Sequence, residues 1–337
     1  MSHTKLNVAL AMPAHTARAV FPARSLDPLE PALNLLSREP IQDFHSPEGR
    51  ALLEQADILI TGWGCPLIDE AILDAAPRLR HVLHAAGSVK HHIGDACWER
   101  DIQISSAADA NAIPVAEYTV AMIVLANKRI LQIARALHST RTDVLAEQLF
   151  PDMGNYRKRV GIIGASKIGR HVIRLLAPYD LDVVVSDPYL SADEAAVLGV
   201  ERVTLEELVA SSDVVSLHAP SLPSTRNMVH EGLIERLQPG ATFINTARGE
   251  LVDQDALLAR VERGDLYAVL DVTTPWVLPA ESRFYSHPNV LLTPHVAGSL
   301  GNELERMAAS AVGEALRIAR GEALQFRVRV EDLAFTA

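Results

Sequence analysis

Three residues near the middle of the chain have the spacing of a phosphate-binding turn. Gly164, Ser166 and Gly169 follow a short apolar run at residues 160–163, and apolar residues then recur at helical spacing as far as Leu176. This pattern is typical of a strand, a tight turn and a helix. Glycine lets the chain turn sharply and lets the helix lie close to its strand, so that the free amides of the helix N-terminus face a phosphate.

A second apolar run, residues 181–187, ends in Asp187, an acid 23 residues beyond Gly164. At this distance a carboxylate can accept both hydroxyls of an adenosine ribose. The middle position of the turn is Ser166 where glycine is usual, so the turn alone is a weak signal and its context decides. We predict a dinucleotide site here. The alternatives are an α/β turn without a ligand and, for Asp187, a helix or turn cap.

The composition is that of an ordinary globular chain with room for two domains. It has 337 residues, 48% hydrophobic and 22% charged. The formal net charge of −11 argues against general binding to nucleic acid or to an anionic membrane. Two cysteines, Cys65 and Cys97, are too few for a disulfide framework. No apolar run reaches about 18 residues and no signal peptide is recognisable, so we predict a cytoplasmic protein.

The first third of the chain reads as a small α/β domain. Its apolar patterns predict strands over residues 6–12, 56–61 and 81–85. They predict helices over residues 68–76 and 92–100. From Pro114 an apolar pattern continues without a breaker to about residue 139, which predicts one long helix that starts near the proline and crosses between domains. Residues 140–159 are polar and form a surface connection.

Beyond residue 160 strands and helices alternate regularly. The expected strands lie near Val160, Val183, Val214, Thr242, Ala268 and Val290, and the expected helices near Ile168, Leu205, Leu233, Ala256 and Glu303. Six strands spaced by helices predict a doubly wound parallel sheet. A final helix over 302–320, capped by Gly321, and a short strand over 325–332 complete the chain.

Three further motifs carry a family resemblance. They are Val-Val-Ser-Leu-His-Ala-Pro at 214–220, Asn-Thr-Ala-Arg-Gly-Glu-Leu-Val-Asp at 245–253 and Thr-Pro-His-Val-Ala-Gly at 293–298. Together with the glycine turn, and over about residues 80–320, they resemble the D-isomer-specific 2-hydroxyacid dehydrogenases of the phosphoglycerate dehydrogenase and hydroxypyruvate reductase type. The resemblance implies a Rossmann-type sheet inserted into a flavodoxin-like α/β domain. It places the substrate-binding domain at 1–121 and 299–337 and the NAD-binding domain at 122–298.

The resemblance also assigns roles to residues. Arg248 would pair with the substrate's carboxylate and 2-oxygen, which suits a planar guanidinium that stays charged. His295 would give a proton to the ketone oxygen as hydride arrives, or remove it in reverse. Asp271 matches the residue that holds the nicotinamide carboxamide, and the loop Ala86, Gly87 and Ser88 matches the one that grips the substrate carboxylate. The NAD contacts implied are Gly164, Ser166, Lys167, Ile168, Gly169, Asp187, His218, Ala219, Pro220, Thr225, Thr246, Ala247, Arg248, Asp271, His295 and Gly298.

One departure from the family pattern concerns the third catalytic residue. The family has a glutamate followed by proline in an Asp-Val-x-x-x-Glu-Pro segment, and this chain has Trp276 and Val277 at those places. The missing acid normally raises the histidine's pKa and holds its ring. Glu281 could replace it only if the loop were rearranged. If Trp276 lies beside His295, we expect the histidine to titrate at lower pH than in relatives that have the acid.

The sequence therefore predicts an NAD-dependent oxidoreductase that transfers hydride between NAD(H) and C2 of a small D-2-hydroxy acid or 2-keto acid. The alternative is a non-catalytic NAD-binding sensor or scaffold of the same fold. Asp187 favours NAD over NADP, and the long helix favours a homodimer. We expect no nucleic-acid or membrane partner and, because the chain ends at 337, no added regulatory domain. Four histidines with the two cysteines match no zinc pattern, so no metal is expected: His81, His84, His91 and His92.

Overall fold

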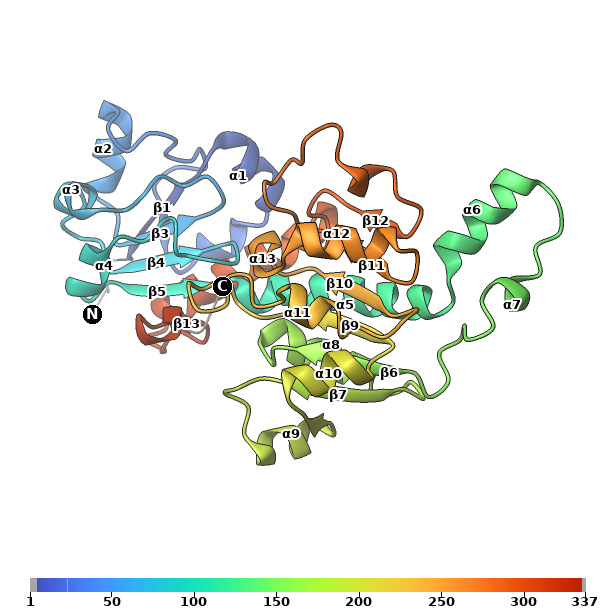
Figure 1. Ribbon diagram of the computed structural model, residues 1–337. Coiled ribbons are helices and arrows are strands. Elements are labelled where there is room, and N and C mark those ends of the chain that lie inside the picture. Colours follow the sequence, from blue (N-terminus) through green and yellow to red (C-terminus); the bar gives the residue numbers. More distant parts are fainter. Residues whose placement is uncertain (1–4, 23, 335–337) are drawn as a thin grey trace. The chain divides into compact units, whose positions relative to one another are not determined.

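A computed structural model describes residues 5–22 and 24–334 as two compact units (Figure 1). One unit comprises the chain up to Asn111 together with the segment from Ser299, and the other comprises Ala112–Gly298. The first division falls near the start of helix α5 (Ala108–Asn127), whereas the sequence places the passage between domains after residue 121, inside this helix. Residues 335–337 of the expected substrate domain lie outside the described residues.

The first unit is built on a sheet of β-strands in the order β13-β5-β4-β3-β1-β2. Read from the β2 edge of the sheet, the spatial order of β1 to β5 is 2-1-3-4-5, which is the flavodoxin-like order. This part of the predicted fold is therefore confirmed. The terminal strand predicted over 325–332 is much shorter and pairs antiparallel with β5. The strands are β1 (Asn7–Ala11), β2 (Asn34–Leu35), β3 (Ile58–Thr61), β4 (His81–His84), β5 (Gln103–Ser106) and β13 (Arg327–Val328).

Alternating side chains bury both faces of this sheet, as the period of a strand requires. Val8 and Leu10 pack on one face with the first and last helices of the unit, and Ala9 and Ala11 pack on the other face with three short helices. The helices of the first face are α1 (Ala14–Val20) and α13 (Leu304–Ala319), and those of the second are α2 (Pro47–Leu53), α3 (Glu70–Ala75) and α4 (Asp95–Glu99).

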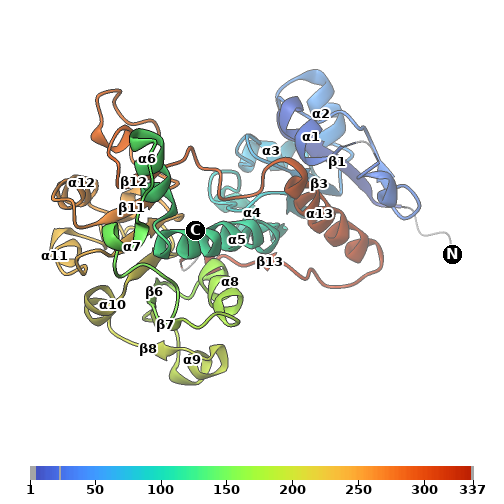
Figure 2. The same cartoon turned by 90° about the vertical axis from the view of Figure 1, so that its right-hand side faces the viewer.

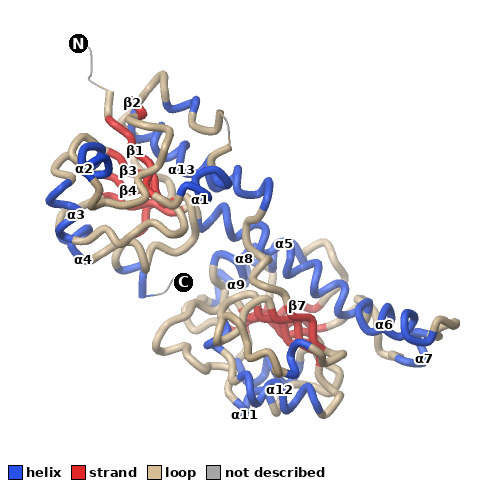
Figure 3. The backbone as a smooth tube through the Cα atoms, turned by 90° about the horizontal axis from the view of Figure 1, so that it is seen from above, coloured by secondary structure: helices blue, strands red, loops and turns tan. Residues whose placement is uncertain are grey.

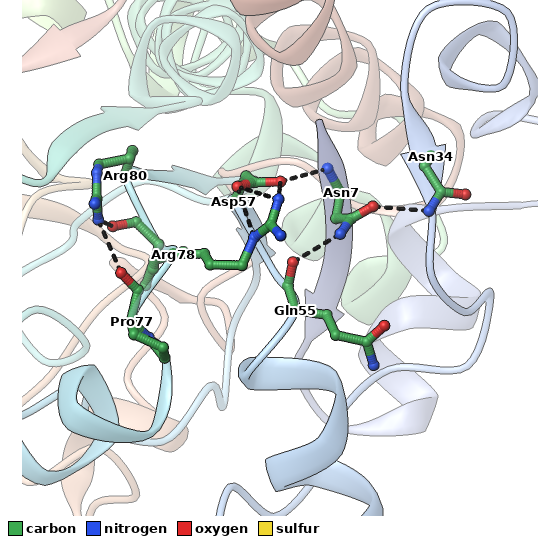
Figure 4. Close-up of polar contacts among 8 residues, drawn as sticks. Asn7, Asn34, Gln55, Asp57, Pro77, Arg78 and Arg80 are labelled. Carbon is green, nitrogen blue, oxygen red and sulfur yellow. Dashed lines mark hydrogen bonds and ion pairs between the residues drawn. The ribbon is translucent and has the colours of Figure 1, made fainter. Parts of the chain in front are cut away.

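Asp57 closes the amino-terminal edge of the same sheet (Figure 4). Its carboxylate accepts the N–H of Asn7 at 2.9 Å and the guanidinium of Arg78 at 3.1 Å. The Asn7 amide donates to the Gln55 carbonyl at 2.9 Å, and Asn34 donates to the Asn7 side chain at 2.7 Å. Ligands of parallel sheets bind at the opposite edge, beyond the carboxyl ends of the strands, so this network is structural.

The second unit contains a parallel sheet in the order β12-β11-β10-β9-β6-β7-β8. Counted in chain order within the unit, this is 7-6-5-4-1-2-3, the doubly wound dinucleotide-binding order, and the predicted Rossmann-type sheet is confirmed. The order reverses between β6 and β9. The strands are β6 (Arg159–Ile163), β7 (Asp182–Ser186), β8 (Glu201–Arg202), β9 (Val214–Leu217), β10 (Thr242–Asn245), β11 (Tyr267–Leu270) and β12 (Val290–Leu292).

Helices cover both faces of this second sheet, and the strands lie at its centre (Figures 2 and 3). One face packs on α10, α11 and α12, and the other on α5, α8 and α9. Their bounds are α8 (Lys167–Leu176), α9 (Ala192–Leu198), α10 (Leu205–Ser211), α11 (Glu231–Ile234) and α12 (Gln254–Glu262). Short 3-10 turns cover η1 (Asp27–Leu29), η2 (Gly249–Leu251), η3 (Arg283–Tyr285), η4 (Gly301–Glu303) and η5 (Glu331–Ala334).

The predicted single helix from Pro114 to about residue 139 is wrong. Pro114 lies inside α5, which begins earlier, and the helix breaks before α6 (Ile130–Thr140). Arg129 adopts a left-handed φ of 52° at the break. Its guanidinium donates to the Gly240 carbonyl and the Thr242 hydroxyl and lies 3.8 Å from the centre of the Tyr267 ring. These contacts with the sheet, which no local pattern reveals, hold the break in place.

Among the described residues, α5 is the one helix that is long and apolar enough to cross a membrane, judged by length and composition. The core helix of a globular domain meets the same criteria. Three of its apolar residues, Ala116, Val120 and Ile123, are buried in the core between this helix and the sheet of the second unit. The apolar stretch of α5 is therefore used, at least on this side, for packing within its own unit.

Candidate active site

The turn between β6 and α8 requires glycine at two positions. Gly164 has a φ of +93°, and a Cβ there would lie 2.8 Å from the Ala219 nitrogen. A Cβ at Gly169 would lie 2.0 Å from the Gly164 carbonyl oxygen. Ser166 is the N-cap of α8, and its hydroxyl accepts the Gly169 N–H at 3.4 Å. Serine thus fits the middle position because it caps the helix, whose first residues are Lys167 and Ile168.

Asp187 follows the neighbouring strand β7 and lies against this turn. One carboxylate oxygen accepts the Ala165 N–H at 2.7 Å, and the other accepts the Tyr189 N–H at 2.7 Å. An ionised carboxylate has about four acceptor positions, so further donors can be bound. Asp187 therefore stands at the place expected for a ribose ligand, and it also caps the local backbone.

His218 follows β9, on the other side of the strand-order reversal. Its backbone N–H donates to the Ile163 carbonyl at 2.7 Å, which brings Ala219 against Gly164. The ring is buried and its Nε2 lies 2.9 Å from the Ser216 hydroxyl, and burial lowers its pKa to about 3. The imidazole is thus a neutral packing group, and the backbone is what this position offers to a cofactor.

The loop after His218 is held by its own hydrogen bonds. The Thr225 hydroxyl donates to the Pro220 carbonyl at 2.6 Å and accepts the Leu222 N–H at 2.9 Å. The predicted contacts Pro220 and Thr225 therefore belong to one closed turn beyond the carboxyl end of β9. The Thr225 hydroxyl shapes this turn.

Arg248 follows β10 in a turn framed by one asparagine. The Asn245 side chain accepts the Ala247 N–H at 2.9 Å and donates to the Arg248 carbonyl at 2.9 Å. The guanidinium is partly buried and donates to the Ala247 carbonyl at 2.7 Å. Burial lowers the Arg248 pKa, and the Glu250 charge raises it, but a guanidinium remains charged at neutral pH. Thr246 lies within 3.2 Å of the Thr119 hydroxyl of α5.

A glycine, Gly249, follows Arg248 because the backbone there has no room for a side chain. A Cβ at Gly249 would lie 2.2 Å from the carbonyl carbon of Thr273 and 2.5 Å from the nitrogen of Thr274. The turn that carries Arg248 therefore packs directly against the loop that follows β11. This close approach brings the Arg248 turn and the Trp276 loop together.

Asp271, at the end of β11, holds the loop that carries His295. One of its carboxylate oxygens accepts the Thr293 hydroxyl at 2.6 Å and the Val296 N–H at 2.8 Å, and the other accepts the Ala297 N–H at 2.9 Å. Its backbone carbonyl accepts the His295 N–H at 2.8 Å. His295 has a left-handed φ of 58°, which is unusual for a residue with a side chain. The buried carboxylate stabilises this conformation, a role that the sequence analysis missed.

Tyr118 and Thr293 are two further residues of this network that the sequence analysis did not identify as part of the site. The Tyr118 hydroxyl of α5 lies 3.0 Å from the Thr293 hydroxyl, which in turn donates to Asp271. Thr293 could have been found from its place in the Thr-Pro-His motif. Tyr118 could not, because it appears in the sequence only as one member of an apolar helical pattern.

The environment of His295 favours the neutral ring. Partial burial lowers its pKa, the nearby Arg248 charge lowers it further, and Asp271 raises it. Its Nδ1 is buried and has no hydrogen-bond partner among the described residues. Glu281 is exposed, and Asp271 is the one described carboxylate that raises the His295 pKa.

Trp276 lies against His295, as the sequence analysis assumes for its pH argument. The two ring centroids are 4.7 Å apart and the planes are inclined by 32°. The indole remains 66% exposed. An aromatic surface therefore lies against one side of the imidazole.

The predicted substrate loop belongs to the first unit, where it follows β4. Ala86 is buried and its carbonyl accepts the Ala107 N–H at 3.0 Å, while Gly87 and Ser88 are partly exposed. Beneath it, His84 Nδ1 lies 2.8 Å from the Thr61 hydroxyl, and burial lowers the His84 pKa to about 3. Within the described part of the chain, no group of three or more His, Cys, Asp or Glu residues could hold a metal ion.

A family model agrees with this geometry. The D-isomer specific 2-hydroxyacid dehydrogenase NAD binding domain matches residues 120–297. The chain belongs to this dehydrogenase family. The part of the family model that matches this chain is its NAD binding domain. The two crowded glycines, the capped N-terminus of α8 and the carboxylate of Asp187 fit the pyrophosphate and the ribose of that cofactor.

Curated relatives that this chain matches include longer proteins. It is 31% identical over 285 residues to the D-3-phosphoglycerate dehydrogenase of Mycobacterium leprae, across 83% of this chain and 52% of the relative. It is 28% identical over 284 residues to the enzyme of that name from Methanocaldococcus jannaschii, across 83% and 53%. The chain thus spans about half the length of the curated relatives it matches.

Solved structures match over nearly the whole chain. A protein from Thermus thermophilus shares 27% identity with a TM-score of 0.75, over 96% of this chain and 100% of that one. The D-isomer specific 2-hydroxyacid dehydrogenase of Lactobacillus delbrueckii ssp. bulgaricus, in its NAD-complexed form, has a TM-score of 0.79 at 19% identity, over 96% and 100%. At that identity the second likeness supports the fold alone.

Proposed function

We propose that the chain is an NAD-dependent oxidoreductase that transfers hydride between NAD(H) and C2 of a small D-2-hydroxy acid or 2-keto acid. The packing of the Arg248 turn against the loop after β11 carries the proposal, because the same loop brings Trp276 against His295. The loops of Arg248 and His295 follow β10 and β12, which flank β11 in the sheet. A fixed cation and a proton carrier at the carboxyl ends of these strands suit a substrate with a carboxylate beside a reacting oxygen.

NAD would be held by the turn at Gly164, Ser166 and Gly169, with Asp187 at the ribose. The bound cofactor supplies the hydride for reduction and accepts it for oxidation. Asp187 selects NAD over NADP, because a 2′-phosphate would meet a like charge. Asp271 supports the His295 loop, and the family resemblance assigns it the nicotinamide carboxamide.

Two side chains and one loop act on the substrate. The Arg248 guanidinium binds its carboxylate and 2-oxygen through paired donors. In reduction, the His295 imidazolium gives its proton to the oxygen on C2 as that atom gains charge, and in oxidation the neutral ring removes it. The backbone of Ala86, Gly87 and Ser88, which belongs to the first unit, stays a predicted contact of the carboxylate. Because Trp276 and Arg248 both favour neutral His295, reduction should slow at lower pH than it would with an acid beside the ring.

The active form is a symmetric homodimer that works in the cytoplasm. Helix α6 buries none of its residues, and with α7 (Ala146–Leu149) it lies at the edge of its unit, where Arg135 contacts carbonyls at and before β12 (Figures 1 and 3). An amphipathic helix is stabilised when its apolar face is buried. In a symmetric dimer, this face of α6 would pack against the same face of a second copy of the chain. Large apolar side chains are exposed along this segment, at Ile130, Leu137, Leu145 and Leu149.

NADH oxidation measured against glyoxylate, hydroxypyruvate and phosphohydroxypyruvate tests the proposal. The wild type should reduce at least one of them. His295→Gln should lower kcat by about 10²- to 10⁴-fold, the usual contribution of a general acid, while leaving NADH binding intact. Arg248→Lys should mainly raise KM. His45→Gln, at an exposed position of the first unit, is the matched control. Wild type that binds NADH but reduces no keto acid would refute the proposed activity.

A further inference from the structure

A cavity of about 360 Å³ lies within the second unit, beneath the loop that follows β11. His295 and Trp276 form part of its wall, and the rest of the wall is largely apolar. The apolar wall comes from two segments close in sequence, with Val277 and Leu278 on the loop after Trp276 and Phe284 and Tyr285 on η3. The cavity thus reaches the proposed proton carrier, and it opens to solvent, because Trp276, Val277 and Tyr285 on its wall are 66%, 72% and 51% exposed.

The polar groups on the cavity wall are already bound. The Tyr285 hydroxyl donates to the Leu278 carbonyl at 3.2 Å. A ligand in the cavity would therefore contact the ring of Tyr285. The Asp271 carboxylate holds the His295 loop through three hydrogen bonds. The guanidinium of Arg135 donates to the carbonyls of His287, Pro288 and Val290.

We propose that this cavity receives the side chain of the 2-keto acid, and that this side chain is large and apolar, either branched aliphatic or aromatic. The proposal rests on the proposed function, because it needs the substrate's 2-oxygen at His295, on the cavity wall. It goes further by naming the substrate class.

The size of the cavity supports this choice. Pockets for small ligands have volumes of roughly 300–1,000 Å³ and are mostly apolar with a few polar groups that set orientation. The hydrogen of glyoxylate or the methyl group of pyruvate would leave most of the space empty. A single additional methylene in an apolar pocket changes kcat/KM by about 10- to 200-fold. Phenylpyruvate and 4-methyl-2-oxopentanoate should therefore exceed pyruvate by at least about tenfold in kcat/KM.

Val277→Arg tests the proposal with little risk to the fold, since Val277 is 72% exposed. The new cation would stand on the apolar wall, so the ratio of kcat/KM for phenylpyruvate to that for glyoxylate should fall by about tenfold or more. Val197→Arg is the matched control, because Val197 is 88% exposed on α9 and does not line the cavity. It should leave the ratio unchanged. Tyr285→Arg, a second exposed wall position, should repeat the effect of Val277→Arg.

Three outcomes would overturn the proposal. Equal kcat/KM for large and small keto acids in the wild type would show that the cavity takes no side chain, while the proposed hydride transfer would stand. If light scattering shows that Val277→Arg changes the mass of the assembly, and the selectivity ratio is unchanged, a second copy of the chain covers the cavity. If no keto acid is reduced, the proposed function fails, and the assignment of this cavity fails with it.

Discussion

The indole of Trp276 lies against the imidazole of His295, with ring centroids 4.7 Å apart and planes inclined by 32°. The indole excludes water from one side of the imidazole, which disfavours the charged ring. Its π-face also attracts an imidazolium, typically by about 0.5–2 kcal/mol, which opposes the first effect. A carboxylate in the same place would favour the charged ring more strongly than the indole does. The pKa of His295 should therefore be lower with tryptophan than with glutamate at position 276.

Trp276→Glu should raise the pKa of His295 and move the upper limb of the pH profile for keto-acid reduction to higher pH. Reduction uses the protonated ring, so the rate near pH 8 should increase. Oxidation uses the neutral ring, so its lower limit should also move to higher pH. The midpoint can be measured by NMR titration of the imidazole and compared with the kinetic profile. Trp276→Phe, which keeps an aromatic ring, should leave the midpoint low.

An unchanged midpoint in Trp276→Glu, in a folded protein that still binds NAD, would contradict this account of the stacked pair. It would mean that the titration of His295 is governed by Arg248 and Asp271 alone, or that the proton passes through another group.

Asp271→Asn should loosen the loop that carries His295. An amide cannot accept at all the positions where the carboxylate meets three donors, and hydrogen bonds to a charged group contribute about 1.5–3 kcal/mol each. We expect a lower Tm, a lower kcat and a further decrease of the His295 pKa, because Asp271 raises it. Thr293→Val removes one donor but keeps the charge, and should have the smaller effect on the pKa. Unaltered Tm and kcat in Asp271→Asn would argue against its supporting role.

Asp187→Ala should weaken NAD binding and reduce the preference for NAD over NADP. The substitution removes the acceptor for the ribose hydroxyls and the charge that repels a 2′-phosphate. It also frees the Ala165 and Tyr189 N–H groups, so the turn itself will be less ordered. Fluorescence titration with NADH and NADPH measures both constants. A wild type that prefers NADPH, or a variant with unchanged NADH affinity, would remove Asp187 from the cofactor site.

Leu137→Glu should dissociate the proposed homodimer. Leu137 is 49% exposed on α6, so in a monomer the substitution would cost little, whereas in a dimer it would place a charge in an apolar interface. Light scattering at micromolar concentration should give twice the chain mass for the wild type and a smaller mass for the variant. Val197→Glu, also exposed but on α9, serves as the control. A wild-type monomer would rule the proposal out.

The sequence predicts the two sheets well because their strands have strong local signals. The regular alternation predicts the parallel sheet of the second unit, the family resemblance implies the flavodoxin-like first unit, and β2, β5 and β8 are not predicted. The glycine turn is visible because steric crowding excludes side chains at Gly164 and Gly169. The break at Arg129 has no such signal, since contacts with Gly240, Thr242 and Tyr267, more than a hundred residues away, hold it.

The site is predicted less completely than the fold. Arg248 and His295 lie in recognisable motifs, whereas the contact of Trp276 with His295 is an assumption at the level of the sequence and is seen only in the structure. The support from Tyr118 through Thr293 to Asp271 depends on how α5 packs on the sheet, which no spacing in the sequence encodes. The ring of His218 points to Ser216, and this too is decided by packing.

Transfer of deuterium from NADH labelled at C4 to a 2-keto acid, followed by mass spectrometry of a single turnover, tests the central claim most directly. The proposed mechanism predicts a D-2-hydroxy acid with deuterium at C2 for the wild type, and an NADH complex of His295→Gln that forms almost no labelled product on the same timescale. Tight NADH binding by the wild type, with no deuterium in any 2-hydroxy acid across small and large keto acids, would contradict the claim and leave a protein that binds the cofactor without using its hydride.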